Sequence, residues 1–283
     1  MIATRGRAAN KLDSSDNEER SLMGAKKQKL QRFLSAHSNC YFCGGAATTI
    51  DHVPSRECFI GRVGPEGYEF PACKRCNNSA GPAEQTVALY RHCTDFAEDI
   101  RGRPQVEKLL SGLRNNSPTR VPITEVSANQ KRQLARRSNI ALQTGDTYAG
   151  LPIVGITRDV HHDFKVFSRR LTCALFYRHA GNILPATHMI KTQWIQFAHG
   201  RAEKIVADIT ADMPHLTQTG RVNTNIGQQF SYRWYLDAGT ETFLFAAQFA
   251  MAFFIFGLTA RFALETSGEG WESHQSDYPE PFR

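Results

Sequence analysis

The chain has 283 residues, enough for two domains, and 41% hydrophobic residues, enough to build hydrophobic cores. Its formal net charge is +7, and it contains seven cysteines. An odd cysteine count argues against a secreted disulfide scaffold and favours the reducing cytoplasm. The first 20 residues are polar and charged, so we expect no secretory signal there.

The positive charge is concentrated in the first half of the chain. Residues 1–140 contain 22 Lys and Arg against 14 Asp and Glu, a charge of +8, whereas the remainder contains 12 against 13, a charge of −1. This distribution is typical of a nucleic-acid contact surface, and a basic solvated surface would give the same count. Residues 26–34 predict a basic helix that either lies along a phosphate backbone or packs its apolar residues inward.

Two CxxC motifs are the most informative feature of the sequence. They place four thiols in two pairs: Cys40 and Cys43, then Cys73 and Cys76. Two such pairs complete the tetrahedral shell of a structural zinc. The 29 residues between the motifs, 44–72, exceed the roughly 15–20 of a simple site, so we expect the insert to have its own role. It contains Asp51 beside His52, residue types suited to holding a metal and a base.

These motifs resemble a known family. In chain order they read Cys-Tyr-Phe-Cys at 40–43, Thr-Ile-Asp-His-Val-Pro at 49–54 and Phe-Pro-Ala-Cys-Lys-Arg-Cys-Asn-Asn at 70–78. This order resembles the zinc-ribbon form of the HNH endonucleases, over roughly residues 38–90. The resemblance implies a ββα-metal module, with strands near 48–50 and 68–70, a loop at 61–67 and a helix starting near the second CxxC.

The resemblance also implies roles for individual residues. His52 would be the general base that activates water, for which an unperturbed pKa of about 6.5 is suitable. Asp51 and Asn77 would hold Mg²⁺ or Mn²⁺ against the scissile phosphate of DNA, since such cations favour oxygen ligands. Asn78 is a neighbouring candidate, and Glu84 is a candidate for the outer shell of the metal. The four cysteines would hold zinc purely as a staple.

The sequence departs from the family's His, Asn and His positions at two places. The last His is replaced by Asn77, which still offers an oxygen ligand. Tyr68 stands where the family has its middle Asn, and the loop 61–67 contains no Asn. A regular strand would also point Asp51 and His52 to opposite faces. A structural role for His52 and a helix-capping role for Asn77 therefore stay open.

The rest of the chain predicts an α+β domain with antiparallel strands. The domain boundaries that we expect are a disordered segment 1–22, a nuclease domain 23–117, a second domain 118–265 and a polar tail 266–283 that frays. The elements that the pattern predicts are helices at 83–100, 104–114, 125–143, 161–179 and 202–213, a linker at 115–118, and strands at 187–197, at 230–237 and within 243–258. The last apolar run has 16 residues, fewer than the roughly 20 of a membrane span, so we expect no membrane contact.

Three functions compete. The first is a metal-dependent HNH endonuclease that hydrolyses DNA, with structural Zn²⁺ and catalytic Mg²⁺ or Mn²⁺. The second is a zinc-stapled nucleic-acid-binding protein whose module does not cleave. The third is a zinc module for protein assembly. Residues 167–185 faintly resemble the region after the zinc module in small bacterial and phage HNH proteins, and the second domain could select the target, bind a protein partner or form a homodimer.

Overall fold

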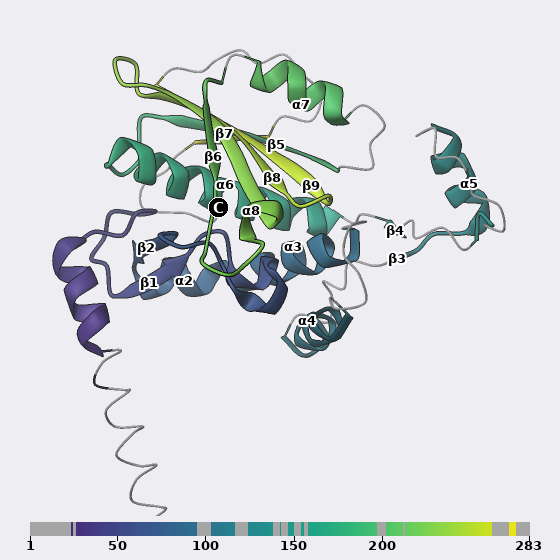
Figure 1. Cartoon of the computed structure of the whole chain (residues 1–283), viewed down its shortest axis with the longest axis horizontal. Coiled ribbons are helices and arrows are strands. Elements are labelled where there is room, and N and C mark those ends of the chain that lie inside the picture. Colours follow the sequence, from purple (N-terminus) through teal and green to yellow (C-terminus); the bar gives the residue numbers. More distant parts are fainter. Residues whose placement is uncertain are drawn as a thin grey trace, which may run out of the picture.

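The computed structural model describes residue 24 and residues 27–94, 103–116, 124–137, 142, 147–149, 154–155, 158–196, 202–211, 213–261 and 272–275. These residues form an α+β fold with antiparallel sheets, as the sequence predicts (Figure 1). The segment 1–22 and most of the tail 266–283 lie outside the described residues.

The amino-terminal part is built on a small two-stranded sheet. A helix at 27–36 precedes it, and its elements are β1 (Thr49–His52), the 3₁₀ helices η1 (Arg56–Cys58) and η2 (Ile60–Arg62), β2 (Glu69–Ala72), α2 (Lys74–Ser79) and α3 (Gly81–Thr94). β1 and β2 are antiparallel, with His52 opposite Glu69. α2 ends at Ser79, and α3 begins at Gly81. Pro82 lacks the backbone N–H that a continuous helix would need at this point.

A six-stranded antiparallel sheet forms the second half. Its strands, in spatial order, are β10 (Glu272–Gln275), β5 (Met189–Gln196), β9 (Phe253–Ala260), β8 (Thr242–Phe249), β7 (Phe230–Asp237) and β6 (His215–Gln218). All eight residues of β9 are buried. The apolar run at 243–258 is thus two central strands, which confirms the prediction of buried strands.

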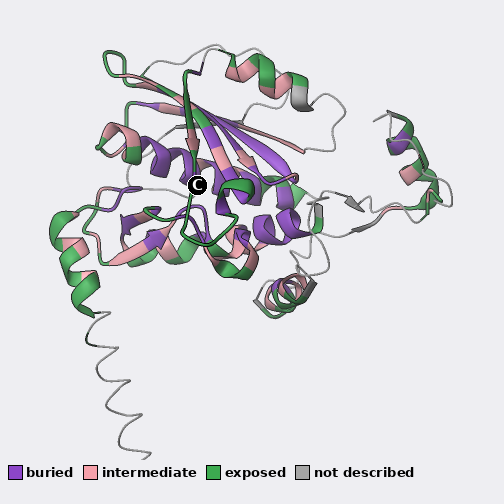
Figure 2. Cartoon of the chain, viewed as in Figure 1, coloured by how far each residue is buried: buried purple, intermediate pink, exposed green. Residues whose placement is uncertain are grey.

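Both faces of this sheet are covered, which explains why the run has no polar alternation. The long helix α6 (Arg158–Ala180) packs on one face, where Phe245 and Phe253 join the main core. The helix α7 (Ala202–Thr210) lies over the other face (Figures 1 and 2), where Phe254 and Phe256 form a smaller core. A β-carbon added at Gly257 would lie 2.1 Å from Cε1 of Phe245, so the sheet requires glycine there.

α6 lies between the sheet and the amino-terminal part, against α3 (Figure 1). The main core is continuous through this helix and includes Tyr41, Phe59 and Phe70 from the amino-terminal part and Phe164, Phe176 and Phe230 from the rest. The boundary expected at 117–118 lies outside the described residues, but the two regions on either side of it share one core.

Two further helices, α4 (Arg103–Asn116) and α5 (Ala128–Arg137), match the helices expected at 104–114 and 125–143 with shifted ends. The short elements β3 (Thr124–Glu125), β4 (Val154–Gly155) and α8 (Ile226–Gln229) were not predicted, and β3 includes the first residue of the helix expected at 125–143. Asn115 and Asn116 end α4 instead of forming a linker. Residues 272–275 form β10, although the sequence predicts a frayed tail, because their backbone pairs with β5 at the sheet edge. None of the described helices has the length and apolar character needed to span a bilayer.

Candidate active site

The four cysteines of the CxxC motifs converge on one point. Their sulfur atoms all lie within 4.8 Å of one another, and Cys43 Sγ and Cys73 Sγ are 3.7 Å apart. Sulfur atoms held about 2.3 Å from one zinc ion at tetrahedral corners would be roughly 3.8 Å apart. The cluster therefore has the ligands and the dimensions of a structural zinc site.

Local backbone geometry and hydrogen bonding prepare this cluster. In the first CxxC turn the amide N–H of Gly44 donates to the carbonyl of Cys40 at 2.8 Å, and Gly44 takes a positive φ of 65°. In the second, Cys73 caps α2, because its sulfur accepts from the amide of Cys76. A hydrogen bond from Cys76 lowers the pKa of the Cys40 thiol to about 5 against the effect of burial, which favours the thiolate that binds metals.

Asp51 and His52 are neighbours on β1 but face opposite ways, because side chains alternate along a strand. Asp51 is 4% exposed and faces α6. His52 is half-buried and lines a surface pocket. The structure thus separates the two residues that the resemblance places in one site.

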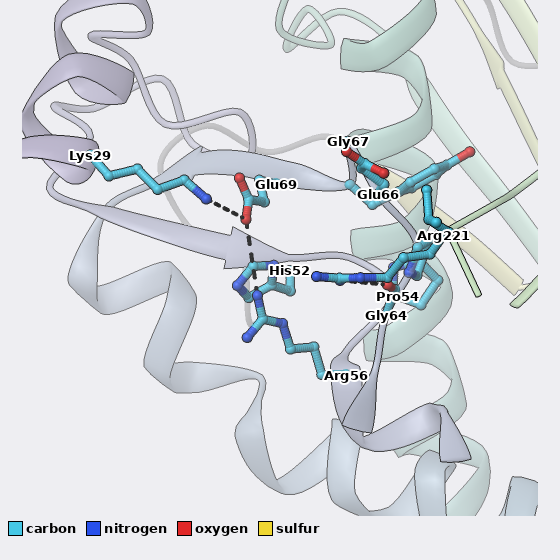
Figure 3. Close-up of a pocket in the computed structure, with 12 residues that line it drawn as sticks. Lys29, His52, Pro54, Arg56, Gly64, Glu66, Gly67, Glu69 and Arg221 are labelled. Atoms are coloured by element: carbon cyan, nitrogen blue, oxygen red, sulfur yellow. Dashed lines mark hydrogen bonds and ion pairs between the residues drawn. The ribbon is translucent and has the colours of Figure 1, made fainter. Parts of the chain in front are cut away.

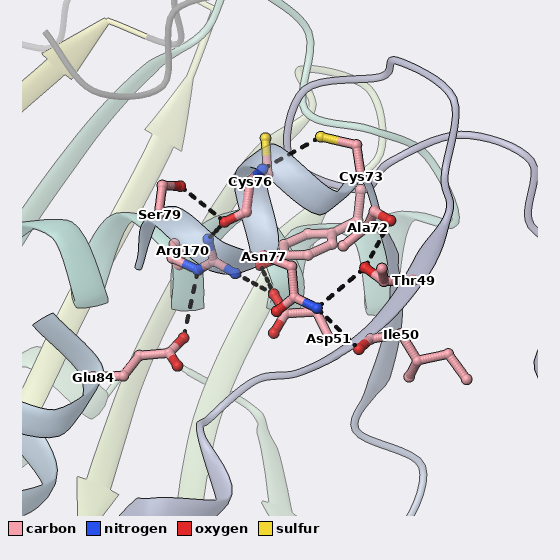
Figure 4. Close-up of polar contacts among 11 residues, drawn as sticks. Thr49, Ile50, Asp51, Ala72, Cys73, Cys76, Asn77, Ser79, Glu84 and Arg170 are labelled. Atoms are coloured by element: carbon pink, nitrogen blue, oxygen red, sulfur yellow. Dashed lines mark hydrogen bonds and ion pairs between the residues drawn. The ribbon is translucent and has the colours of Figure 1, made fainter. Parts of the chain in front are cut away.

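Arg170 of α6 occupies the position next to the Asp51 carboxylate (Figure 4). Its guanidinium donates to Asp51 Oδ2 and to the carbonyl of Cys76, and it is 1% exposed. The hydroxyl of Tyr41 donates to the same carboxylate oxygen at 2.9 Å. Asp51 is therefore held in a buried ion pair that links the cysteine cluster to α6.

Glu84 of α3 contributes a second carboxylate to this network. Its Oε1 lies 3.7 Å from Nε of Arg170. Burial raises the pKa of Glu84 to about 7, although Arg170 opposes the shift. The residue expected at the periphery of a metal site is thus a partner of an arginine.

Asn77 connects α2 to β1. Its side-chain amide donates to Thr49 Oγ1 at 3.1 Å and to the carbonyl of Ile50 at 3.2 Å (Figure 4). The neighbouring Asn78 is exposed. Asn77 therefore lies close to the Asp51 network, with its N–H groups directed at the strand backbone.

A hydrated divalent cation does not fit between Asp51 and Asn77 in this arrangement. Arg170 already supplies the positive charge to Asp51, and both the burial of the carboxylate and the cover of α6 separate it from a substrate phosphate. Such a cation normally retains water ligands and binds the substrate directly. Asp51 and Asn77 therefore do not present a pair of free oxygen ligands beside His52.

The His52 pocket has a volume of about 490 Å³ and is open to solvent (Figure 3). Its charged lining consists of Lys29, Arg56, Glu66, Glu69 and Arg221. Burial, followed by the charge of Arg56, lowers the pKa of His52. The ring makes no hydrogen bond to another described residue, so a neutral imidazole is available to accept a proton.

Arg221 comes from the second half, between β6 and α8, and no motif in the sequence marks it as a site residue. The only signal in the sequence is a Thr-Gly-Arg-Val-Asn-Thr-Asn stretch at 219–225 that is rich in turn-forming residues. Nothing in that stretch indicates that the chain returns to the His52 pocket.

No family model, curated protein or solved structure matches this chain. The resemblance to HNH endonucleases therefore depends on the motifs between Cys40 and Asn78 and on the site that they build.

Proposed function

We propose that the protein is an endonuclease related to the HNH type, which hydrolyses DNA phosphodiester bonds at the His52 pocket and is stapled by a four-cysteine zinc. The main support is the position of His52 at the end of β1, on a small sheet beside the four-cysteine cluster. There His52 lines an open pocket together with three cationic side chains, Lys29, Arg56 and Arg221. Strand, connection, strand and helix follow in the order that the resemblance implies.

In this proposal His52 accepts the proton of a water molecule as the water oxygen attacks phosphorus. The bond between phosphorus and the 3′-oxygen breaks, and the leaving oxygen takes a proton from solvent. The cationic side chains stabilise the charge that develops on the phosphate. A lowered pKa keeps the imidazole of His52 unprotonated near neutral pH, as a base must be.

A second function has a specific observation in its favour. Arg170 closes the Asp51 side of β1, so the pair of oxygen ligands that the resemblance implies is not presented to a substrate. A zinc-stapled protein that binds nucleic acid without cleaving it would tolerate this closure. Binding would then use the same cationic pocket.

Supercoiled plasmid incubated with purified protein in Mg²⁺, in Mn²⁺ and in EDTA distinguishes the two functions. We expect the wild type to nick or linearise the plasmid in at least one condition and His52→Ala to be slower by at least about 100-fold, the lower range for a general base. His162→Ala, which changes an exposed histidine of α6, is the matched control and should cut normally. Zinc content is measured in every sample, because EDTA can also remove the staple.

Plasmid that stays intact in all three conditions, while a gel shift shows that it is bound, would favour the second function. Normal cleavage by His52→Ala would remove His52 from the proposal.

A further inference from the structure

The loop at 219–225 joins the six-stranded sheet to the rim of the His52 pocket. The amide of Glu66 donates to the carbonyl of Gly220 at 3.2 Å, and Nη1 of Arg221 donates to the carbonyl of Gly64 at 3.2 Å. The hydroxyl of Thr224 donates to the carbonyl of Arg221 at 2.8 Å. These contacts hold Arg221 at the pocket, although the residue is exposed.

Arg221 differs from the other two cations of the pocket in its partners. Lys29 and Arg56 both lie near the carboxylate of Glu69, at 3.5 Å and 4.0 Å. Arg221 has no carboxylate partner within the described part of the chain, and the single hydrogen bond of its guanidinium uses one of five N–H donors. Figure 3 shows its side chain extending toward His52. Its guanidinium is therefore fixed at the pocket of the candidate base and has further N–H groups that can bind a ligand.

We propose that Arg221 binds the non-bridging oxygens of the phosphate that lies beside His52, so that the carboxyl-terminal half completes the site. The inference rests on the proposed function. A guanidinium presents parallel donors that match two phosphate oxygens, which a point charge cannot do. Arg56 lines the same pocket from the amino-terminal part, so the phosphate would be held from both halves of the chain.

The Asp51 network supports this assignment. With Arg170 pairing Asp51 on the far face of β1, positive charge at the reacting phosphate has to come from the His52 face. The three cations there come from the helix at 27–36, from η1 and from the 219–225 loop. Of these, only Arg221 belongs to the nearly neutral second half.

DNA binding of the wild type and three variants tests the proposal directly. The probe is a fluorescein-labelled DNA duplex in buffer without Mg²⁺, Mn²⁺ or EDTA at several salt concentrations, and the readout is fluorescence anisotropy. We expect Arg221→Gln to weaken binding roughly tenfold, as for one hydrogen bond to a charged group, and to reduce the salt slope by about one. Arg221→Lys keeps the positive charge but loses the parallel donors of the guanidinium. Its affinity for DNA should lie between those of the wild type and Arg221→Gln.

Arg233→Gln is the charge-matched control, because Arg233 is an exposed residue of β7 that does not line the pocket. It should change the affinity by less than about twofold, as a distant surface charge does. Equal affinities for Arg221→Gln and Arg233→Gln would overturn the proposal. Thermal unfolding of each variant shows whether it is folded, and Arg221→Lys keeps the test decisive if Arg221→Gln is not.

A titration with inorganic phosphate separates this inference from the proposed function. In protein with ¹³C-labelled histidine, phosphate should shift the His52 ring signal of the wild type and leave that of Arg221→Gln unchanged. If this is seen in a protein that does not cut plasmid, the phosphate site stands and the nuclease proposal fails. If the wild type cuts plasmid but both proteins respond equally to phosphate, the nuclease proposal stands and the role of Arg221 is refuted.

Discussion

The two faces of β1 have opposite environments, although the residues that define them are adjacent. On one face Asp51 is buried with Arg170 and Tyr41. On the other face His52 lines an open pocket and makes no hydrogen bond to a described residue. A strand alternates its side chains, so one residue step leads from a buried carboxylate to an imidazole that lines a solvent-open pocket.

This difference separates stability from chemistry. The Asp51 face ties the cysteine cluster to α6 and therefore to the main core. The His52 face presents an imidazole of lowered pKa among cationic side chains. Substitutions on the first face should thus change the free energy of unfolding, and in the proposed function substitutions on the second face should change plasmid cleavage.

The largest effect is expected from loss of the zinc site, which supports both faces of β1. Cys73→Ser deletes one ligand of the four-cysteine cluster, and β1, β2 and α2 are the elements around that cluster. Because structural zinc supplies about 10–16 kcal/mol in zinc-finger peptides, we expect the variant to lose one equivalent of zinc and the amino-terminal fold. Metal analysis and circular dichroism check this.

Cys93→Ser is the control for the zinc prediction, since Cys93 is exposed and lies outside the cluster. It should keep its zinc. Full zinc content in Cys73→Ser would contradict the assignment of the site.

The next effect belongs to the Asp51 face alone. Arg170→Met leaves the carboxylate of Asp51 buried without its cation, which should lower the free energy of unfolding by about 3–5 kcal/mol. Urea denaturation measures this value. Adding Asp51→Leu to the variant should restore part of the loss, because no unpaired charge then remains buried. A loss below about 1 kcal/mol for Arg170→Met would contradict the buried ion pair.

The sequence predicts the local elements around β1 much better than the residues that contact its two faces. The four cysteines, the strand before His52 and the helix after Cys73 follow from spacing and local propensity, and the structure brings the four cysteines together. Alternation along a strand also indicates that Asp51 and His52 separate. What it could not indicate is the partner on each face.

Those partners come from distant parts of the chain. Arg170 lies 119 residues from Asp51, and Arg221 lies 157 residues from Gly64. The strand β6 and the short helix α8, which flank the Arg221 loop, have four residues each and give almost no periodic signal. Long-range contacts of this kind depend on how the sheet and α6 pack, which local patterns do not encode.

The titration of Glu84 tests the Asp51 face of β1 while Asp51 itself stays unchanged. Folding raises the pKa of Glu84 from 4.5 to about 7 through burial, so the folded chain holds this proton more tightly than the unfolded chain. The contribution of Glu84 to stability is thus fully present below about pH 4.5 and is lost as the pH rises toward 7. We expect Glu84→Gln, which keeps the shape, to lose less stability than the wild type over this pH range.

Urea denaturation at several pH values measures the difference between Glu84→Gln and the wild type. Parallel pH profiles for the two proteins would show that Glu84 does not titrate in this range.

A smaller effect is expected where the amino-terminal part meets the sheet. The hydroxyl of Tyr68 donates to that of Tyr232 at 3.0 Å, and Tyr232 also lies 2.9 Å from Nε2 of His179. Tyr68→Phe removes one buried hydrogen bond and should cost about 1 kcal/mol in urea denaturation. Tyr235→Phe, at a 39% exposed position of β7, should change stability by less than about 0.5 kcal/mol. Equal losses in the free energy of unfolding for the two variants would show that the contact between Tyr68 and Tyr232 does not stabilise the protein.

The smallest expected change in stability sharpens the comparison most. His52→Asn alters a half-buried side chain that has no hydrogen bond to a described residue, so the free energy of unfolding should change by less than about 0.5 kcal/mol. In the proposed function the same substitution removes the base, and plasmid cleavage should fall by at least about 100-fold. Asp51→Asn should show the reverse order, with a large loss of stability because it weakens the pair with Arg170. If His52→Asn destabilised the protein as much as Asp51→Asn, both faces of β1 would be structural. This result would contradict the proposed catalytic role of His52.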